Sequence, residues 1–364
     1  MNSKILLVVL VAVFCAVEVS AQKKSVCYYF AKIPVTQINP RICTHLIFSF
    51  FGLDAYGNID YMWRSEADVA YYLSQMVAMK WQNPNLKVLV AIGGYNEPLV
   101  PAWYQMAENP DRRNNFANNA LRIVRDYNLD GIDIDWEYPN FDGTRPQDKA
   151  NFVYLLQDLK RVLGGYLVTT AIGAGAWRTD MSYDLWGIFN AVDFVNVMTY
   201  DLHGGWTGIT GIHGALFRSN LDQTDSNVDA SVRLIINAGV DRNKLIMGIA
   251  TYGIAFRLND PNNNGVSAPA SSDGDLTYYE ICSAVRAGQL NHRWDNDQMV
   301  PYAFAGTQWV GYEDLGSVTE KAHYINNMGL GGSMYWAVDN DDYNGICGDG
   351  EYPLISRVNS IVVG

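Results

Sequence analysis

Positively charged residues are scarce in this sequence. Lysine and arginine together number 26, against 38 aspartates and glutamates, so the formal net charge is -12. Nucleic acids and anionic membranes reward clustered positive charge, and we therefore expect neither of them as a partner. A neutral substrate fits this composition better.

Motifs that hold metal ions are also missing. The sequence has neither a Cys-x-x-Cys pair nor a His-Glu-x-x-His segment, which are spacings typical of zinc sites. Its histidines are scattered along the chain at His45, His203, His213, His292 and His323. We therefore expect no metal and no cofactor.

Long apolar runs are absent after the start of the chain. There, a lysine precedes an apolar run over residues 5–17, and small residues end the segment at Ala21. This order is typical of a secretory signal peptide over residues 1–21. A membrane anchor fits less well, because the run is short for a bilayer and Glu18 follows it. We expect the mature chain, residues 22–364, to be a secreted, extracellular protein.

Cysteine is rare, with five in the whole sequence. Cys15 leaves with the signal peptide, so four cysteines remain in an oxidising compartment, where an even number indicates disulfides. Three pairings are possible. The positions of the cysteines at opposite ends of the chain favour Cys27 with Cys43 and Cys282 with Cys347.

Short apolar and β-branched runs alternate with helical patterns, as in β/α units around a parallel sheet. The expected strands cover residues 26–30, 44–50, 87–94, 131–136, 166–173, 193–201, 244–251 and 331–339. The expected helices lie around residues 66–82, 111–127, 147–163, 224–238 and 318–328, where apolar residues recur at intervals of three and four. Eight such units predict an α/β fold, a TIM (β/α)8 barrel with its function at the carboxyl ends of the strands.

One interval breaks this rhythm. The seventh and eighth expected strands are separated by far more chain than a βα connection needs, and the interval contains aromatic, alternating segments. We expect an inserted α+β subdomain over about residues 253–318, which would form a wall on the catalytic face. After Tyr352 the chain needs only a final helix.

The segment DGIDIDWEYP, residues 130–139, alternates apolar residues with Asp133, Asp135 and Glu137. A period of two is that of a strand, so the three acids face the same way and can share protons. Glu137 lies closest to the carboxyl end and is the expected proton donor, while Asp135 would hold a polar group of the substrate and Asp133 would share a proton. A purely structural carboxylate network is the alternative, but unpaired buried acids are costly. Asp130 has the opposite parity, which suggests a cap or turn role.

Two further strand ends carry polar or aromatic side chains. The sixth expected strand ends in MTYD, which would turn Met198 and Tyr200 inward and place Asp201 at the rim. The eighth supplies Trp336, whose indole is broad enough to lie under a sugar ring. Core packing is the ordinary role of such aromatic residues.

These segments together resemble glycoside hydrolase family 18, the chitinases. The resemblance rests on DGIDIDWEYP, MTYDLHGGW, ATYGIAF, LTYYEICSAV, VPYAFAGTQWVGYED and GGSMYWAVDNDDYNGICGDGEYPL, which occur in the family's order. It extends from Val26 almost to the C-terminus. It also implies both disulfides and the α+β insertion.

The resemblance implies a role for each motif residue. Glu137 would protonate the glycosidic oxygen while the substrate's own 2-acetamido carbonyl attacks the anomeric carbon, a substrate-assisted mechanism. Asp135 would orient the acetamido N–H, Asp133 would take part of its proton, and Tyr200 would bond the acetamido oxygen. Trp336 would underlie the sugar at the cleavage site. The remaining substrate-binding residues implied are Tyr28, Phe50, Tyr95, Tyr138, Met198, Asp201, Trp206 and Tyr252.

Three positions depart from the family pattern. Lys32 stands where a cleft tryptophan is common, Tyr95 stands where many members have tryptophan, and Ile254 stands where a polar residue is usual. The non-reducing side of the cleft would therefore be less aromatic and less charged. The acidic motif is intact.

The sequence thus predicts a monomeric, endo-acting chitinase that binds chitin or chitooligosaccharides and cleaves β-1,4 bonds between N-acetylglucosamine units. Two alternatives stay open. A chitinase-like lectin or growth-factor-like protein would use the same fold for binding alone, although such members have usually lost the final acid. An endo-N-acetylglucosaminidase acting on N-glycans shares the acid motif.

Overall fold

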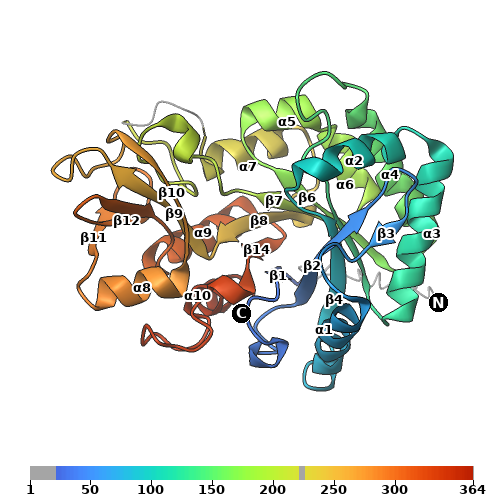
Figure 1. Ribbon diagram of the computed structural model, residues 1–364, viewed down its shortest axis with the longest axis horizontal. Helices are drawn as coiled ribbons and strands as arrows, with labels where there is room; N and C mark the ends of the chain where they lie inside the picture. Colours follow the sequence, from blue (N-terminus) through green and yellow to red (C-terminus); the bar gives the residue numbers. More distant parts are fainter. Residues whose placement is uncertain (1–21, 221–225, 364) are drawn as a thin grey trace, which may run out of the picture.

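Eight parallel strands form a closed barrel in the computed structural model, which describes residues 22–220 and 226–363 (Figure 1). The strands are β1 (Lys24–Tyr29), β2 (His45–Leu53), β4 (Lys87–Gly93), β5 (Gly131–Asp135), β6 (Leu167–Gly173), β7 (Phe194–Met198), β8 (Leu245–Ala250) and β14 (Gly332–Trp336). Their order is β1-β14-β8-β7-β6-β5-β4-β2, and pairing of β1 with β2 closes the ring. The predicted TIM barrel is confirmed, while the expected signal peptide lies outside the described residues.

The closed order places β14 and β5 on opposite sides of the ring. Counting along the hydrogen-bonded neighbours, β5 is the fourth strand from β14 in either direction. Side chains at the carboxyl ends of these two strands therefore face each other across the mouth of the barrel.

Each expected strand is present, but several end earlier than predicted. The expected strand 193–201 ends at Met198, because the chain turns after it: the N–H of Thr199 bonds the carbonyl of Val197, and Asp201 has a φ of 53°. The expected strand 331–339 likewise ends at Trp336. The residues expected to carry chemistry at these positions therefore lie at strand ends or just beyond them.

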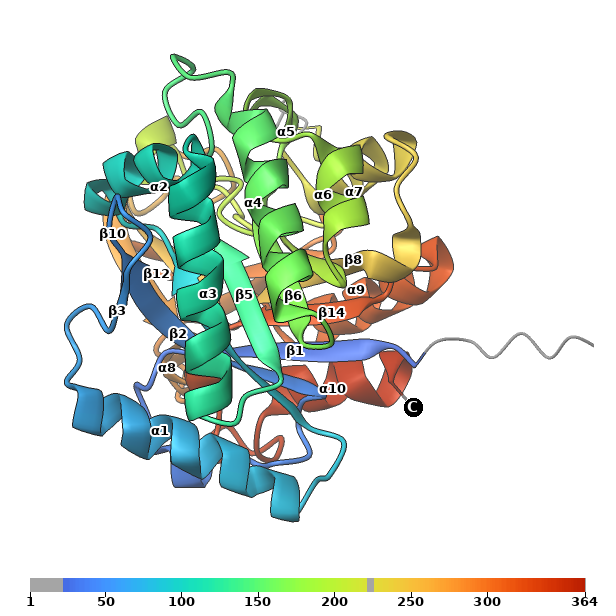
Figure 2. The ribbon, with the colours of Figure 1, turned by 90° about the vertical axis from the view of Figure 1, so that its right-hand side faces the viewer.

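Helices cover the outside of the barrel. They are α1 (Glu66–Ala78), α2 (Val100–Ala107), α3 (Pro110–Asp126), α4 (Asp148–Leu163), α5 (Ala176–Ser182), α6 (Leu185–Ala191), α7 (Val228–Asn237), α9 (Leu315–Met328) and α10 (Pro353–Val362). Figure 2 shows α3 and α4 side by side over β5 and β6. The sequence pattern did not predict α2, α5 and α6, since segments of seven or eight residues are too short to show a helical period.

Local chemistry sets several helix ends. The side chain of Asn109 accepts the N–H groups of Asp111 and Arg112 at the start of α3, where proline occupies the first helical position. The Asp314 side chain accepts the N–H of Ser317 at the start of α9, and α9 stops at Gly329, whose φ of 67° suits glycine. Short 3-10 helices occupy Val35–Gln37, Met79–Trp81, Glu97–Leu99, Gly205–Thr207, Arg242–Lys244 and Val338–Asn340.

A second, antiparallel sheet is inserted between β8 and β14, where the sequence predicts an α+β subdomain. It contains β9 (Tyr252–Leu258), β10 (Ala270–Thr277), β11 (Asn291–Asp295), β12 (Val300–Ala305) and β13 (Gln308–Gly311), together with α8 (Tyr278–Arg286). The strand order is β10-β9-β13-β12-β11. In Figure 1 this insertion, coloured in yellow-brown and orange tones, stands to one side of the barrel. A two-residue strand, β3 (Ile59–Asp60), also pairs with the end of β2.

The alternation expected for β5 is present. Ile132 and Ile134 are fully buried in the apolar layer between barrel and helices, whereas Asp133 and Asp135 have the opposite parity and face the barrel interior. Burial of each isoleucine contributes about 1.5 to 3 kcal/mol. The apolar face therefore holds the strand in register and fixes where the acids point.

Both expected disulfides are present. Cys27 pairs with Cys43 and Cys282 with Cys347, with Cα–Cα distances of 6.0 and 5.9 Å. The second bond ties α8 of the insertion to the loop that follows β14. Among the described helices, none has both the length and the apolar character that crossing a membrane requires.

Candidate active site

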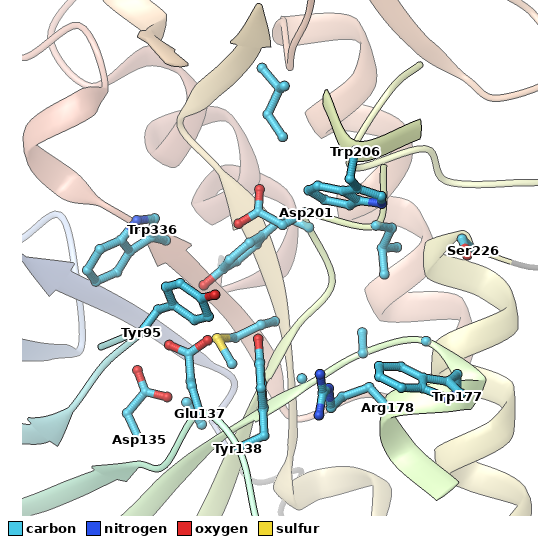
Figure 3. Close-up of a pocket in the computed structure, with 18 of the residues that line it drawn as sticks. Tyr95, Asp135, Glu137, Tyr138, Trp177, Arg178, Asp201, Trp206, Ser226 and Trp336 are labelled. Atoms are coloured by element: carbon cyan, nitrogen blue, oxygen red, sulfur yellow. The ribbon is translucent and has the colours of Figure 1, made fainter. Parts of the chain in front are cut away.

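A cavity of about 720 Å³ opens at the carboxyl ends of the barrel strands (Figure 3). Most of the side chains that the sequence predicts for the site line it, namely Tyr28, Phe50, Tyr95, Asp135, Glu137, Tyr138, Met198, Tyr200, Asp201, Trp206 and Trp336. Two predicted residues do not line it. Asp133 lies behind Asp135, and Tyr252 packs behind Asp201.

Asp133 is fully buried and well supplied with hydrogen bonds. Its carboxylate accepts Tyr28 Oη at 2.6 Å, Thr169 Oγ1 at 2.5 Å and Asn196 Nδ2 at 3.3 Å. Burial raises the pKa of Asp133 to about 6, and the three hydrogen bonds oppose that rise. Asp133 is thus held in place and can exchange a proton near neutral pH.

Asp135 differs from Asp133 because one of its oxygens is unsatisfied. Its Oδ1 atom is buried and has no hydrogen-bond partner among the described residues. Burial raises the pKa of Asp135 well above its ordinary value, and the negative charges of Glu137 and Asp133 raise it further. A buried acceptor without a partner costs stability, so this oxygen is available to a ligand that offers an N–H or O–H.

Glu137 lies two residues beyond the end of β5 and reaches into the cavity. Burial raises its pKa to about 7; a hydrogen bond from Tyr138 and the charge of Arg178 lower it, whereas the charge of Asp201 raises it. The carboxyl group is therefore protonated in mildly acidic solution. A side chain that holds its proton close to working pH is suited to general acid catalysis.

These three residues, Asp133, Asp135 and Glu137, are called the β5 acids below. Asp130, at the other end of the strand, is separate from them: it accepts the N–H of Val88 at 2.7 Å and pairs with Lys80 at 2.5 Å. Its expected structural role agrees with these contacts.

Several buried tyrosines supply hydroxyl donors around the acids. Burial raises the pKa values of Tyr28, Tyr138, Tyr200 and Tyr252 well above the ordinary value, with nearby carboxylates adding to the effect. All four phenols therefore keep their protons. Among the described residues, the one hydrogen-bond partner of the Tyr200 hydroxyl is the sulfur of Met334, at 3.7 Å. Sulfur is a weak acceptor, so a substrate oxygen could take its place.

Asp201 stands at the rim with a half-exposed side chain. Its Oδ1 atom accepts the Tyr252 hydroxyl at 2.5 Å and lies 3.3 Å from Nδ1 of His213. The sequence analysis predicts that Tyr252 lines the cleft. In the structure, the Tyr252 hydroxyl instead orients Asp201 through its hydrogen bond. His213 was not predicted as a site residue, because its ring reaches Asp201 only through the folded loop after β7.

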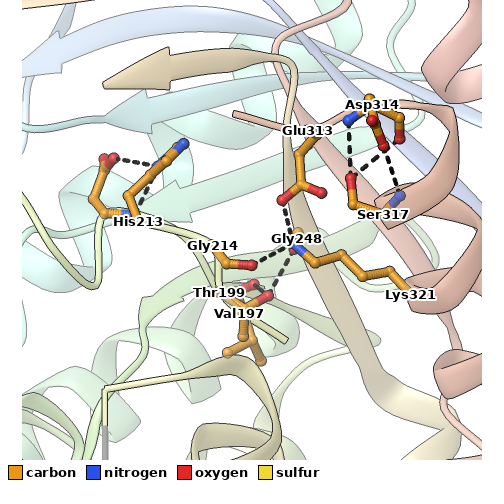
Figure 4. A network of polar contacts seen from close by, with 10 residues as sticks. Val197, Thr199, His213, Gly214, Gly248, Glu313, Asp314, Ser317 and Lys321 are labelled. Atoms are coloured by element: carbon orange, nitrogen blue, oxygen red, sulfur yellow. Dashed lines mark hydrogen bonds and ion pairs between the residues drawn. The ribbon is translucent and has the colours of Figure 1, made fainter. Parts of the chain in front are cut away.

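A buried ion pair anchors that loop to the insertion side of the molecule (Figure 4). Lys321, on α9, donates to the carbonyl of Gly214 at 2.5 Å and forms a short contact with Glu313, and both charged side chains are almost completely buried. Removal of one partner would leave an uncompensated buried charge, which is strongly destabilising. The pair therefore fixes the segment that carries His213.

An aromatic cluster forms the opposite wall. The indole of Trp336 stacks on Phe50 with ring centroids 5.5 Å apart, and the ring of Tyr28 meets it edge-on at 5.7 Å. Such contacts hold the indole in one orientation. Trp336 thus presents a fixed apolar surface toward the acids on the far side of the barrel.

Three peptide bonds near the cavity are cis although none precedes proline. They are Ser49–Phe50, Glu137–Tyr138 and Trp336–Ala337. Each includes a residue that lines the cavity.

Exposed aromatic residues mark the cavity rim. The side chain of Trp206 is 72% exposed and its indole lies over Gly204, where a Cβ atom would come within 2.2 Å of the ring. Tyr95 is 64% exposed, and its hydroxyl donates to Glu97 at 3.1 Å. Lys32 does not line the cavity: its Nζ atom donates to Asn340 at 3.0 Å.

Three of the cavity-wall residues that the sequence reasoning missed have aromatic or charged side chains. Trp177 and Arg178 lie in the first turn of α5, shortly after β6, and Asp275 comes from β10 of the insertion. The position of Trp177 and Arg178 just beyond a barrel strand could have identified them. Asp275 carries no such signal, because its approach depends on how the insertion packs on the barrel.

One group of residues within the described ranges has the side-chain spacing of a metal site, Cys282, Asp342 and Cys347. The disulfide uses both sulfur atoms, so this group offers a metal no thiolate ligands. The β5 acids are hydrogen-bonded to protein groups or open to the cavity, which suits direct contact with an organic substrate.

Comparison with known proteins agrees with this geometry. The chain matches the family described as "Glycosyl hydrolases family 18" over residues 24–341. It is 35% identical to Chitotriosidase-1 of Mus musculus over 341 residues, which covers 87% of this chain and 71% of that protein. The structure of Ostrinia furnacalis Group IV chitinase in complex with allosamidin superposes with a TM-score of 0.89 at 34% identity, covering 93% and 98% of the two chains.

A non-catalytic relative is almost as similar. Human YKL-39, described as a pseudo-chitinase with retained chitooligosaccharide binding properties, superposes with a TM-score of 0.85 at 31% identity, covering 94% of this chain and all of that one (100%). Similarity at this level is therefore shared by chitinases and by a pseudo-chitinase. It does establish the family: this chain belongs to glycosyl hydrolase family 18.

Proposed function

We propose that this protein is a secreted, endo-acting chitinase that hydrolyses β-1,4 bonds between N-acetylglucosamine units with retention of configuration. The observation that supports the proposal is the presence of Glu137 in the cavity, with a pKa raised to about 7 by burial and with the unsatisfied Asp135 behind it. A binding protein has no need for a protonated carboxyl group at this place.

In the first step, Glu137 donates its proton to the oxygen of the bond that breaks. The carbonyl oxygen of the substrate's own acetamido group attacks the anomeric carbon and forms an oxazolinium-like intermediate, as expected for a substrate-assisted family. The free oxygen of Asp135 accepts the acetamido N–H, and the Tyr200 hydroxyl donates to the acetamido oxygen. Both contacts hold the acetamido group in line with the anomeric carbon.

In the second step, the deprotonated Glu137 takes a proton from water, which attacks the same carbon and restores its configuration. The intermediate carries positive charge, so negative charge on Asp135 would stabilise it. Asp133 lies one pleat behind on the same face of β5, and its pKa of about 6 lets it take up the proton that Asp135 gives away.

The binding surfaces follow from the same geometry. Trp336 would support the sugar whose anomeric carbon reacts, because its indole faces the acids across the barrel. The leaving sugars would then extend past Glu137 toward α5. The two disulfides suit an oxidising, extracellular location, and we propose that the protein acts there as a monomer.

Non-catalytic binding of chitooligosaccharides is a second candidate, because YKL-39 shares the fold at 31% identity. Glu137 distinguishes the two, since only an enzyme requires its proton. The third possibility, action on N-glycans, rests on the acid motif alone.

The test compares hydrolysis of an N-acetylglucosamine hexasaccharide with hydrolysis of a high-mannose N-glycan. We expect the wild-type protein to release shorter oligomers from the hexasaccharide only. Glu137→Gln should reduce turnover by about 10²- to 10⁴-fold yet still bind the hexasaccharide, and the exposed Glu66→Gln on α1 should match wild type. Binding without hydrolysis by the wild type would overturn the proposal in favour of a lectin.

A further inference from the structure

The cavity contains an isolated cation. Among the described residues that line it, Arg178 is the one basic side chain, and it shares the wall with Asp135, Glu137, Asp201 and Asp275. Arg178 forms no ion pair with any carboxylate in the described parts of the chain. Its charge is therefore not neutralised by a protein partner.

Aromatic rings hold the guanidinium group. Its central carbon lies 4.2 Å from the ring centroid of Tyr138 and 4.6 Å from that of Trp177. The hydrogen bonds of Nη1, to the carbonyl of Phe141 and the hydroxyl of Ser182, are both long at 3.4 Å. Cation–π contacts fix the plane of the group without satisfying its N–H donors, so donors remain for a ligand.

The position of Arg178 relative to Glu137 shows on which side of the breaking glycosidic bond Arg178 lies. In Figure 3, Glu137 lies between Trp336 and the pair formed by Arg178 and Trp177. In the proposed mechanism, the sugar on Trp336 is the one whose anomeric carbon is attacked. Arg178 therefore lies on the side of the leaving group.

We propose that Arg178 is a specificity-determining residue that makes the leaving-group side accept N-acetylglucosamine and disfavour glucosamine. The inference rests on the proposed chitinase function. The N–H donors of Arg178 can bond a neutral sugar's hydroxyl or acetamido oxygens, whereas the ammonium group of a deacetylated sugar meets a fixed positive charge. Two like charges repel each other even in water, and more strongly in a half-enclosed site.

The carboxyl groups nearby do not cancel this repulsion. Burial raises the pKa of Glu137 to about 7, so this group is largely protonated in mildly acidic solution, and burial raises the pKa of Asp135 as well. The ammonium of glucosamine and a guanidinium both carry positive charge under these conditions. Asp201 already accepts the Tyr252 hydroxyl at 2.5 Å and lies 3.3 Å from Nδ1 of His213. Asp275 has a raised pKa, also from burial.

The experiment uses partially N-acetylated chitooligosaccharides at mildly acidic pH. The sugar that sits directly on the leaving-group side becomes the new non-reducing end of a product. The ratio of glucosamine to N-acetylglucosamine at new non-reducing ends, measured by mass spectrometry and divided by the ratio in the starting material, therefore reports selection at this position.

For the wild type we expect glucosamine to be depleted at the new ends. Arg178→Gln should raise the ratio by about three- to tenfold, Arg178→Lys should stay within about twofold of wild type because the charge is kept, and the exposed Arg122→Gln on α3 should match wild type. If the wild type shows no depletion of glucosamine at the new non-reducing ends, that result alone overturns the inference. A ratio unchanged in Arg178→Gln, with its hydrolysis of the fully acetylated hexasaccharide retained, overturns it as well.

Failure of the proposed function would look different. In that case the wild type would not hydrolyse the fully acetylated hexasaccharide at all, and no new ends would form.

Discussion

Two groups of buried carboxylates lie at carboxyl ends of barrel strands, and they differ in what surrounds them. The β5 acids face a cavity. The second group, called the β14 acids here, follows β14 and consists of Asp339, Asp341 and Asp342, all nearly inaccessible to solvent.

Backbone N–H groups satisfy the β14 acids. Asp341 accepts the N–H groups of Asp342 at 2.8 Å and Ile355 at 3.1 Å, and Asp339 accepts that of Lys32 at 2.7 Å. These contacts tie the end of the barrel to the start of α10 and to the loop after β1. The β14 acids therefore stabilise the fold.

Raised pKa values do not separate the two groups. Burial raises the pKa of Asp341 to about 7, as it does for Glu137. The two groups differ in their hydrogen-bond partners. Asp341 accepts backbone N–H groups, whereas one oxygen of Asp135 has no donor in the part of the chain that the structure describes. A buried acid indicates chemistry only where its hydrogen-bonding capacity is left open toward a cavity.

When Asp135 of the first group is compared with Asp341 of the second, the larger effect on activity is expected for Asp135→Asn. It should lower kcat by about 10²- to 10³-fold, because the amide cannot supply negative charge to the intermediate. It should not lower the melting temperature, since an unpartnered buried acid is removed. The measurements are initial rates on a soluble hexasaccharide and a thermal melt; a variant that melts early and keeps its activity would reverse the assignment.

Asp341→Ala should give the opposite outcome. Loss of its acceptors leaves buried N–H groups without partners, and we expect the free energy of unfolding to fall by about 2 to 5 kcal/mol. The kcat of the folded fraction should stay within about twofold of wild type, because no substrate reaches this site. Urea unfolding and rates at low temperature check both statements, and unchanged stability would contradict them.

The pH dependence should follow Glu137. Only its protonated form can donate, so kcat/KM should decline as pH rises through about 7. Its folded-state pKa exceeds the ordinary 4.5, so the folded state binds more protons between these values and the free energy of unfolding decreases as pH rises across that window. Glu137→Gln should make this decrease less steep. A pH profile that stays flat up to pH 9 would exclude Glu137 as the acid.

The smallest effect is expected at the rim, for Tyr95→Trp. A larger ring offers about 0.5 to 1.5 kcal/mol of additional aromatic contact where the geometry is good, so the variant should bind long oligomers more tightly than short ones. The control is Tyr56→Trp at an exposed position that does not line the cavity. Equal changes in kcat/KM from disaccharide to hexasaccharide would contradict this account of the rim.

The sequence predicts those parts of the site that lie within one strand. The alternation over residues 130–139 places the β5 acids on one face, because the period of two is a property of the strand itself. The paired cysteines and the insertion are likewise visible as positions and spacing along the chain. Local pattern is sufficient for these features.

Other parts depend on contacts between distant segments. Thr169 and Asn196 reach Asp133 because β6 and β7 pair in a particular register, and no local pattern encodes that register. Arg178 lies in the first turn of a helix of seven residues, which is too short to predict from its pattern. Tyr252 was placed on the cleft surface because its segment resembles the family's, whereas its hydroxyl points to Asp201 from behind.

The closed order of the barrel sets the width of the site. Trp336 ends β14 and Glu137 lies just beyond β5, and these strands are four positions apart around the ring in both directions. The number of strands in the barrel therefore determines the distance between the two side chains. Loops can lengthen and the insertion can diverge without altering this distance. Substitutions at the rim can therefore change which chains are bound while the span available to the reacting sugar stays the same.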